Sequence, residues 1–349
     1  MLAVRQTLAA LGVAALCVAA SAPAAQETLE AQRAAAAEPV DTSAFRRDPP
    51  YRIGVSAGYL SNSWVVFALQ HIRWEASLHP ISEIIVTDAA FNPAKQIADI
   101  EDLMQREIDL LIYWPVDDRA IEDTLSRVVE RGVATVQAGG GFNDHPGTIT
   151  SAYISQWELG EMVARRLMED LGGQGRIIAM LPIAGTTAAV DQLAALEHVL
   201  QEFPDIDLAS VEYGDWNRAR AKQITENLLQ RFPRIDGVFS PAGQMSIGVA
   251  EAFDEAGRLD EVTMSPGDEY NGWLKWVAQH GQGGAVTFPP RAGQVAMQAA
   301  MRILAGEPVT RGIQVPSEFI PPDEIGAHVA MDRPDDWWAT ALPDAFLPN

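Results

Sequence analysis

The sequence predicts an α/β protein built from two doubly wound lobes. From Tyr51 onward, short apolar runs typical of buried strands alternate with segments of helical periodicity. This alternation restarts near Leu159, after a glycine-rich turn and a further short apolar run. Repeated strand–helix units are typical of parallel sheets with helices on both faces, and about ten strands exceed one modest sheet. Two Rossmann-like lobes are therefore expected.

Composition and charge restrict the class of partner. The chain has 349 residues, of which 48% are hydrophobic and 21% charged, as in a soluble globular protein. Its formal net charge of −22 argues against nucleic acid and anionic membranes as partners, because both require a basic surface. The net charge does not define the chemistry of a binding pocket.

The N-terminal segment Met1–Ala25 is predicted to be a signal peptide. Arg5 supplies the positive charge, Leu8–Ala20 the apolar core, and Ala22–Ala25 a small-residue cleavage region. A membrane anchor is the alternative, but the apolar run is short for a bilayer. The only cysteine, Cys17, follows a leucine where lipidation would require a small residue. We expect an exported, periplasmic protein without thiol chemistry.

The elements of the first half follow in order. The segment Gln26–Pro50 is expected to be a mobile or partly helical leader outside the core. After the first strand and helix within Tyr51–Trp74, the periodicity predicts strands at 81–86, 109–113 and 133–137, and helices at 93–106 and 120–131. Asn92 and Pro93 are a helix cap and a first helical residue. Residues 149–154 form either a fifth strand or a crossover.

The second half repeats this pattern and ends in an irregular tail. Strands are predicted at 176–181, 208–211, 237–240, 262–265 and 285–288, and helices at 159–171, 190–202, 217–231, 245–256, 273–280 and 293–304. The tail from Glu307 is rich in proline and lacks periodicity, so it should wrap the surface and recross between the lobes. Trp337 and Trp338 are expected to pack on that surface.

No enzyme constellation is found. The six histidines are scattered without metal-binding spacing, and no nucleophile elbow or Walker motif occurs. The triplet Gly139–Gly141 follows a strand but lacks the G-x-G-x-x-G spacing, so a flexible loop is favoured over a phosphate cradle. We predict a non-enzyme without cofactor or metal.

Polar and aromatic residues follow the predicted strands. Ligands of open α/β sheets bind at the carboxyl ends of the strands. Aromatic rings stack on the C–H faces of sugars and polyols, while amides and carboxylates bond their hydroxyls. The expected ligand contacts are Asn62, Trp64, Trp114, Gln137, Asp191, Gln192, Trp216, Ala242, Asp268 and Phe288.

Alternatives remain for several of these positions. Asn62 is also a candidate helix N-cap, together with Ser61 and Ser63. Trp114 and Trp216 could be core residues, Gln192 could lie on an exposed helix face, and Asp268 could cap the helix that follows it.

Five segments carry a family resemblance: IGVSAGYLSNSWVVFALQHIRWEA, FNPAKQIADIEDLMQREIDLLIYWPVD, LPIAGTTAAVDQ, FPRIDGVFSPAGQMSIGVAEAFDEAG and VTMSPGDEYNG. Over Arg52–Phe319 the chain resembles the periplasmic solute-binding proteins of ribose-type sugar ABC transporters. The resemblance implies two lobes joined by three crossovers and closing by hinge motion. One lobe would hold residues 51–154 and 289–315, the other 155–288 and 316–349, after a signal peptide (1–25) and a leader (26–50).

The resemblance carries the same contacts over, except Asp191, but it also shows departures. A ribose-type site usually has Asn-Pro-Phe at Asn62–Trp64, Asp-Arg at Gln137–Ala138, arginines at Val190 and Gln192, and Asn-Asp at Ala242–Gly243. These departures favour another pentose or hexose, a deoxysugar or a polyol over ribose, and leave a less polar metabolite open.

The expected function is capture of a small carbohydrate-like molecule and its delivery to an ABC permease by a monomeric receptor. A sensor that docks on a kinase or chemoreceptor is the main alternative. A transcription-factor domain is disfavoured by the signal peptide and by the lack of a basic helix-turn-helix before Tyr51.

Overall fold

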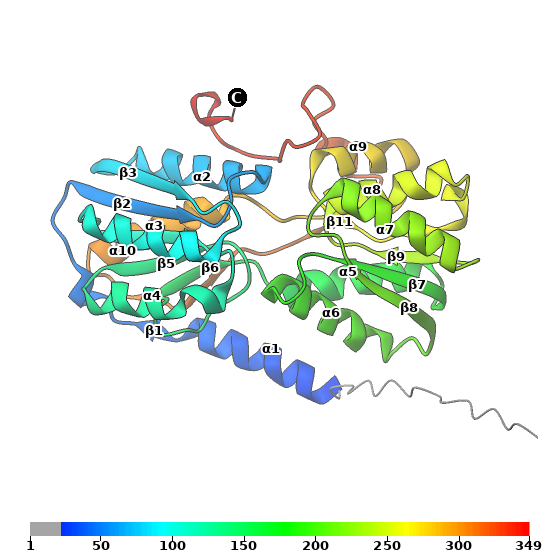
Figure 1. Cartoon of the computed structure of the whole chain (residues 1–349), viewed down its shortest axis with the longest axis horizontal. Coiled ribbons are helices and arrows are strands. Elements are labelled where there is room, and N and C mark those ends of the chain that lie inside the picture. Colours follow the sequence, from blue (N-terminus) through cyan, green and yellow to red (C-terminus); the bar gives the residue numbers. More distant parts are fainter. Residues whose placement is uncertain (1–21, 349) are drawn as a thin grey trace, which may run out of the picture.

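Two α/β lobes lie side by side in the computed structural model, which describes residues 22–348 (Figure 1). Most of the predicted signal peptide lies outside the described residues. Within residues 22–348, no helix is both long and apolar enough to cross a membrane.

The N-terminal lobe contains a six-stranded parallel sheet in the order β14-β6-β5-β4-β2-β3. Its strands are β2 (Tyr51–Ala57), β3 (Ile81–Asp88), β4 (Leu110–Trp114), β5 (Ala134–Ala138), β6 (Thr150–Tyr153) and β14 (Gly312–Gln314). Its helices are α2 (Ser63–Ala76), α3 (Pro93–Gln105), α4 (Asp118–Glu130) and α10 (Ala292–Leu304). The ambiguous segment at 149–154 is therefore a strand, buried throughout.

The C-terminal lobe repeats the design with a four-stranded parallel sheet, β10-β9-β7-β8, and a small mixed sheet, β11-β12-β15. Its strands are β7 (Gln174–Leu181), β8 (Asp205–Tyr213), β9 (Gly237–Phe239), β10 (Thr263–Met264), β11 (Gly267–Asp268), β12 (Ala285–Val286) and β15 (Phe319–Ile320). Its helices are α5 (Gln156–Asp170), α6 (Thr187–Leu200), α7 (Arg218–Arg231), α8 (Gly243–Glu255) and α9 (Asn271–His280).

Within residues 22–348, three segments join the lobes before the tail, as the fold class requires. They run from β6 to α5, from β12 to α10 and from β14 to β15. Several helices that face the cleft begin at a side-chain cap: Asn62 starts α2, Asn92 starts α3 and Thr186 starts α6. Such caps satisfy backbone N–H groups that the first helical turn leaves free, so the helix starts are fixed beside the cleft.

The leader is more ordered than the sequence suggests. Helix α1 (Ala22–Ala37) contacts β14 and α6, and so lies beneath both lobes (Figure 1). Strand β1 (Pro39–Val40) pairs with β13 (Val309–Thr310). Phe45, in the short helix η1 (Ser43–Phe45), packs into the N-terminal lobe. The expectation that this segment stays outside the core was wrong, because Phe45 buries an aromatic ring there.

The tail crosses from one lobe to the other (Figure 1). After β15 it forms η3 (Ile325–Ala327) against α9, and it ends in η4 (Asp344–Phe346) against α2. Trp338 is 4% exposed and belongs to the hydrophobic core of the N-terminal lobe. The expectation of surface packing was therefore wrong for Trp338.

Close packing of α2 against α10 generates a stability prediction. A Cβ atom at Gly293 would collide with the backbone carbonyl of Ala68, whereas one at Gly326 would meet nothing within 4 Å. We expect Gly293→Ala to destabilise the protein by about 1–3 kcal/mol, because the two helices must move apart. Gly326→Ala should stay within about 0.5 kcal/mol of the wild type. Urea unfolding of both variants checks this; equal midpoints would contradict it.

Candidate functional site

A cavity of about 380 Å³ lies between the lobes at the carboxyl ends of the strands. Residues of both lobes and of the connecting segments line it. Nine predicted contacts are among them: Asn62, Trp64, Trp114, Gln137, Gln192, Trp216, Ala242, Asp268 and Phe288. Contact of these residues with a ligand remains a prediction.

Asp191 is the exception. It lies on α6 beside Gln192 but does not line the cavity. Adjacent helical residues point about 100° apart, so only one of the two can face the cleft. The side chain is half-buried, and burial raises its pKa to about 6.

Trp64 is held in place by three neighbours. The Asn62 side chain accepts a hydrogen bond from the Trp64 backbone N–H, which starts α2 at this point. The indole Nε1 donates to the Phe288 carbonyl at 2.7 Å, and the two rings lie 5.3 Å apart. A Cβ atom at Gly139, where φ is 77°, would collide with the indole. Glycine is therefore required where the loop passes this ring.

The glycine triplet supports the site. Gln137 donates to the carbonyls of Gly139 and Gly141, both at 3.2 Å, and its oxygen lies 3.5 Å from the Ser151 hydroxyl. Gln137 thus holds the loop, while its own polar atoms are already occupied. Trp114 packs against the same loop, with its Nε1 about 3.4 Å from where a Cβ of Gly139 would lie.

Two loops, one in each lobe, present an aromatic ring in the same unusual way. Ala90 and Phe91 after β3 have φ of 50° and 61°, and Asp215 and Trp216 after β8 have φ of 54° and 50°. Non-glycine residues in this region cost about 1–2 kcal/mol each. Each loop then enters a helix through an asparagine cap. Phe91 and Trp216 both line the cavity, so the strained backbone aims a ring at the cleft.

Asp268 connects the second lobe's loops. Its Oδ1 accepts from the backbone N–H of Gly243, the first residue of α8, at 3.0 Å, and from that of Tyr270 at 3.3 Å. Ala242 precedes this helix and is buried against the cavity. Burial raises the pKa of Asp268 to about 7, against the lowering effect of the two backbone donors. Asp268 therefore acts as a helix cap and also lines the cavity.

Three polar atoms of cavity-lining residues have no partner. Among the described residues, buried side-chain atoms without a hydrogen bond include Trp114 Nε1, Asp118 Oδ1 and Gln192 Oε1. They comprise one donor and two acceptors. An unpaired buried polar group costs about 1–3 kcal/mol, so this part of the molecule favours a polar guest.

The two lobes touch across the cleft. Thr187, at the start of α6, donates to Asp118 Oδ2, at the start of α4, at 3.2 Å. The Tyr59 and Trp216 rings lie 6.4 Å apart, and Tyr59 stacks on Phe91 at 4.3 Å. The Thr187–Asp118 bond and the Tyr59–Trp216 contact therefore link the two lobes across the cleft.

Sequence reasoning missed several lining residues. They are Tyr59, Phe91, Asp118, Gln156, Thr187 and Trp338. Phe91 stands at a strand end in the quoted FNPAKQ segment, which could have revealed it. Trp338 carried no such signal, because the tail has no periodicity.

A metal site requires several ligating side chains close together. Among residues 22–348, no three His, Cys, Asp or Glu side chains are grouped to hold a metal ion. Side chains pack closely on the glycine triplet, because a Cβ atom at Gly139, Gly140 or Gly141 would meet Trp64, Gln137 or Thr187, respectively.

Comparison with known proteins identifies the family. The model of the periplasmic binding protein domain matches residues 53–308. The chain belongs to this family. It is 25% identical to the ribose import binding protein of Bacillus subtilis over 268 residues, which cover 76% of this chain and 86% of the relative.

Solved structures show the same fold. One is an ABC transporter solute-binding protein from Bacillus halodurans with bound myo-inositol, with a TM-score of 0.74 and 22% identity, covering 79% of this chain and 96% of the other. Another is the fructose-binding periplasmic domain of a hybrid two-component system, with a TM-score of 0.73 and 22% identity, covering 80% and 93%. Type I periplasmic binding proteins therefore share this two-lobed architecture.

Glu269, beside the cavity, generates a pH prediction. Burial and the neighbouring Asp268 raise its pKa to about 8, from an ordinary 4.5, although Phe288 and Arg291 favour its ionised form. Between these values the native state keeps a proton that the unfolded chain releases. The contribution of this proton to the free energy of unfolding is therefore complete below pH 4.5 and is lost as the pH rises toward 8.

We expect Glu269→Gln to show a shallower decline in melting temperature between pH 5 and pH 8 than the wild type. Asp268 contributes to the decline in both proteins, so their difference reports Glu269. Glu197→Gln, on the exposed face of α6, is the matched control and should follow the wild type. An unchanged slope for Glu269→Gln would refute the assignment.

Proposed function

We propose that this periplasmic binding protein captures a small carbohydrate-like molecule, a monosaccharide, deoxysugar or polyol. The unpaired Trp114 Nε1, Asp118 Oδ1 and Gln192 Oε1 among the aromatic walls are the observation that supports it. Hydroxyl groups both donate and accept, so a polyhydroxylated ligand can satisfy all three atoms. Ligands that lack those hydroxyls leave them unpaired and are rejected.

The aromatic rings suit the other faces of such a ligand. Trp64, Trp114 and Trp216 line the cavity together with Phe288 and Phe91. A volume of about 380 Å³ lies at the small end of ligand pockets, which agrees with a compact guest. Two similar proteins bind compounds of this class by name: the ribose import binding protein of Bacillus subtilis and the myo-inositol-bound protein of Bacillus halodurans.

We further propose that the closed form delivers its cargo to an ABC permease. A ligand that contacts both lobes stabilises closure, because its bonds to the second lobe exist only in the closed state. The contact between Asp118 and Thr187 adds a direct link across the cleft. Export to the periplasm through residues 1–25, and a monomeric state, are part of this proposal.

A sensory role is the second candidate. The fructose-binding domain of the two-component system shares this fold and works as part of a signalling protein. Deletion of the gene distinguishes the two roles: lost uptake of the ligand indicates transport, while retained uptake with lost ligand-dependent transcription indicates sensing.

A thermal-shift screen tests the ligand class. The protein from Gln26 onward is heated with D-ribose, D-allose, D-fructose, L-fucose, xylitol, myo-inositol and glycerol, and with a set of amino acids and nucleosides. A ligand that binds only the native state raises the melting temperature by mass action. We expect a shift from one or a few carbohydrates. A shift only from non-carbohydrates would overturn the proposal while keeping the fold.

Trp64 and Trp276 form a matched pair for testing the site. Trp64 lines the cavity, whereas Trp276 stacks between Trp273 and His280 on α9, at 4.7 and 4.4 Å. We expect Trp64→Ala to weaken binding of the identified ligand by about 100-fold or more, because a large contact area is lost. Trp276→Ala should lower the melting temperature and leave affinity within about 2-fold. Titration calorimetry decides, and equal affinities for both variants would refute the assignment.

A further inference from the structure

The tail supplies a wall of the cavity from beyond the residues that match the family model. The match to the family model ends at residue 308, whereas Trp338 lies thirty residues later and lines the cavity. Its indole Nε1 donates to the Ser63 hydroxyl at 2.9 Å, next to Asn62 and Trp64. Its backbone pairs with that of Tyr270 in an isolated bridge, two residues after Asp268. Trp338 thus meets the ligand-facing ends of both lobes.

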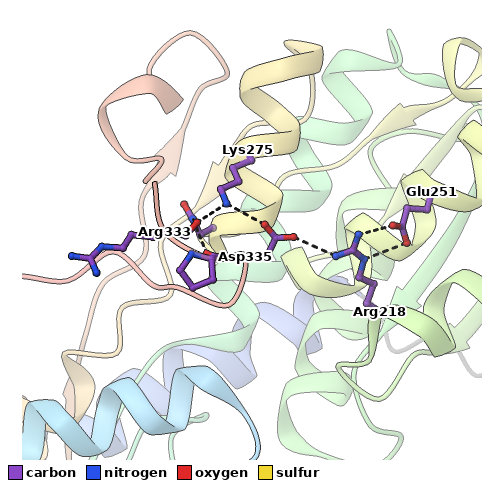
Figure 2. Close-up of polar contacts among 7 residues, drawn as sticks. Arg218, Glu251, Lys275, Arg333 and Asp335 are labelled. Carbon is purple, nitrogen blue, oxygen red and sulfur yellow. Dashed lines mark hydrogen bonds and ion pairs between the residues drawn. The ribbon is translucent and has the colours of Figure 1, made fainter. Parts of the chain in front are cut away.

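The segment before Trp338 is fixed to the C-terminal lobe. Asn271, which is 1% exposed, donates to the carbonyls of Ala330 and Pro334, both at 2.9 Å, and accepts from the Ala330 N–H. Lys275 donates to the Arg333 carbonyl at 2.6 Å and pairs with Asp335 (Figure 2).

Asp335 extends this attachment to a second helix. It also pairs with Arg218 of α7, which is bound in turn to Glu251 of α8 (Figure 2). Exposed ion pairs contribute about 0–1 kcal/mol each, so the buried Asn271 contributes most of the anchoring.

The segment after Trp338 is fixed to the N-terminal lobe. Thr340 lies 2.9 Å from His71 Nε2 on α2, and Leu342 is buried in the N-terminal core. Burial lowers the pKa of His71 to about 4, so this anchor stays uncharged at neutral pH. Phe346 and Leu347 pack on the same core. The tail is therefore held on both sides of the cleft, with Trp338 at the crossing.

We propose that Trp338 is a specificity-determining residue of the ligand site, presented by residues 330–347 as a strap between the lobes. The proposal rests on the proposed function, because it concerns the same cavity. A rigid indole at this wall sets the room available beside Asn62, Trp64 and Asp268. Replacing it should change which ligands fit, and not only how tightly every ligand binds.

The neighbouring Trp337 is the matched control. It lies on the same strap and packs edge-on against Phe67 at 5.0 Å, with Arg333 over its ring, but it does not line the cavity. The experiment measures dissociation constants for xylitol, D-ribose, D-allose and myo-inositol by calorimetry, in the wild type, Trp338→Ala and Trp337→Ala. Melting temperatures are recorded in parallel.

We expect Trp338→Ala to weaken the tightest of these ligands by about 10-fold or more and to change the ratio between the largest and smallest ligands by about 5-fold or more. Trp337→Ala should lower the melting temperature and keep every ratio within about 2-fold. If Trp338→Ala does not fold, Trp338→Phe takes its place; it keeps a ring, loses the bond to Ser63, and should also change the ratio between the largest and smallest ligands.

Two results would overturn the proposal. If Trp338→Ala weakens all four ligands by one common factor, or leaves their affinities unchanged, Trp338 has no role in selectivity. Failure of the wild type to bind any carbohydrate of the screen refutes the proposed function instead, so the two failures are distinguishable.

Discussion

The hydrogen bond from the Trp64 indole to the Phe288 carbonyl links two chain segments at the cavity. It joins the first helix of the N-terminal lobe to the crossover between β12 and α10. The same ring lies against Gly139, at the end of another strand of that lobe. A single side chain therefore fixes a helix start, a loop and a hinge segment around one cavity. Displacing it would disturb all three together.

The two lobes use the same means to bring aromatic rings to the cleft. In each, the loop after the second strand contains two consecutive residues with positive φ, followed by an asparagine that caps the next helix. These matching loops direct the rings of Phe91 and Trp216 toward the cavity. The backbone strain is tolerated because the capped helix and the packed strand hold the loop on either side. Similar loops in both lobes give the cleft an aromatic wall from each side.

Local signals explain why much of the site could be predicted. Asn62 and Trp64 stand directly after an apolar strand, and Asp268 and Trp216 occupy comparable places in the second lobe, so the carboxyl-end rule of parallel sheets applies to them. Asp191 lies outside the cavity lining because the rule does not set the rotation of a helix, and its neighbour Gln192 has the inward position. Gln137 lines the cavity as predicted, but its bonds to the glycine loop could not be inferred from spacing.

Contacts between residues far apart in the sequence could not be predicted from its local pattern. The need for Gly139 arises from a ring 75 residues earlier, and Phe91 has a positive φ although it is not a glycine. The leader and the tail lack periodicity, so the burial of Phe45 and Trp338 depends on contacts that only the folded lobes create. The two wrong expectations, for Phe45 and Trp338, therefore concern the leader and the tail.

Trp338 lines the cavity but stands late in the sequence, after the strands of both lobes. A chain is synthesised from its amino end, and the strands of both lobes, through β15 (Phe319–Ile320), precede Trp338 in the sequence. Both lobes can pair most of their strands before Trp338 is synthesised, but the pocket still lacks one side. The wall that Trp338 contributes to the cavity can therefore form only after the strands of both lobes have been synthesised.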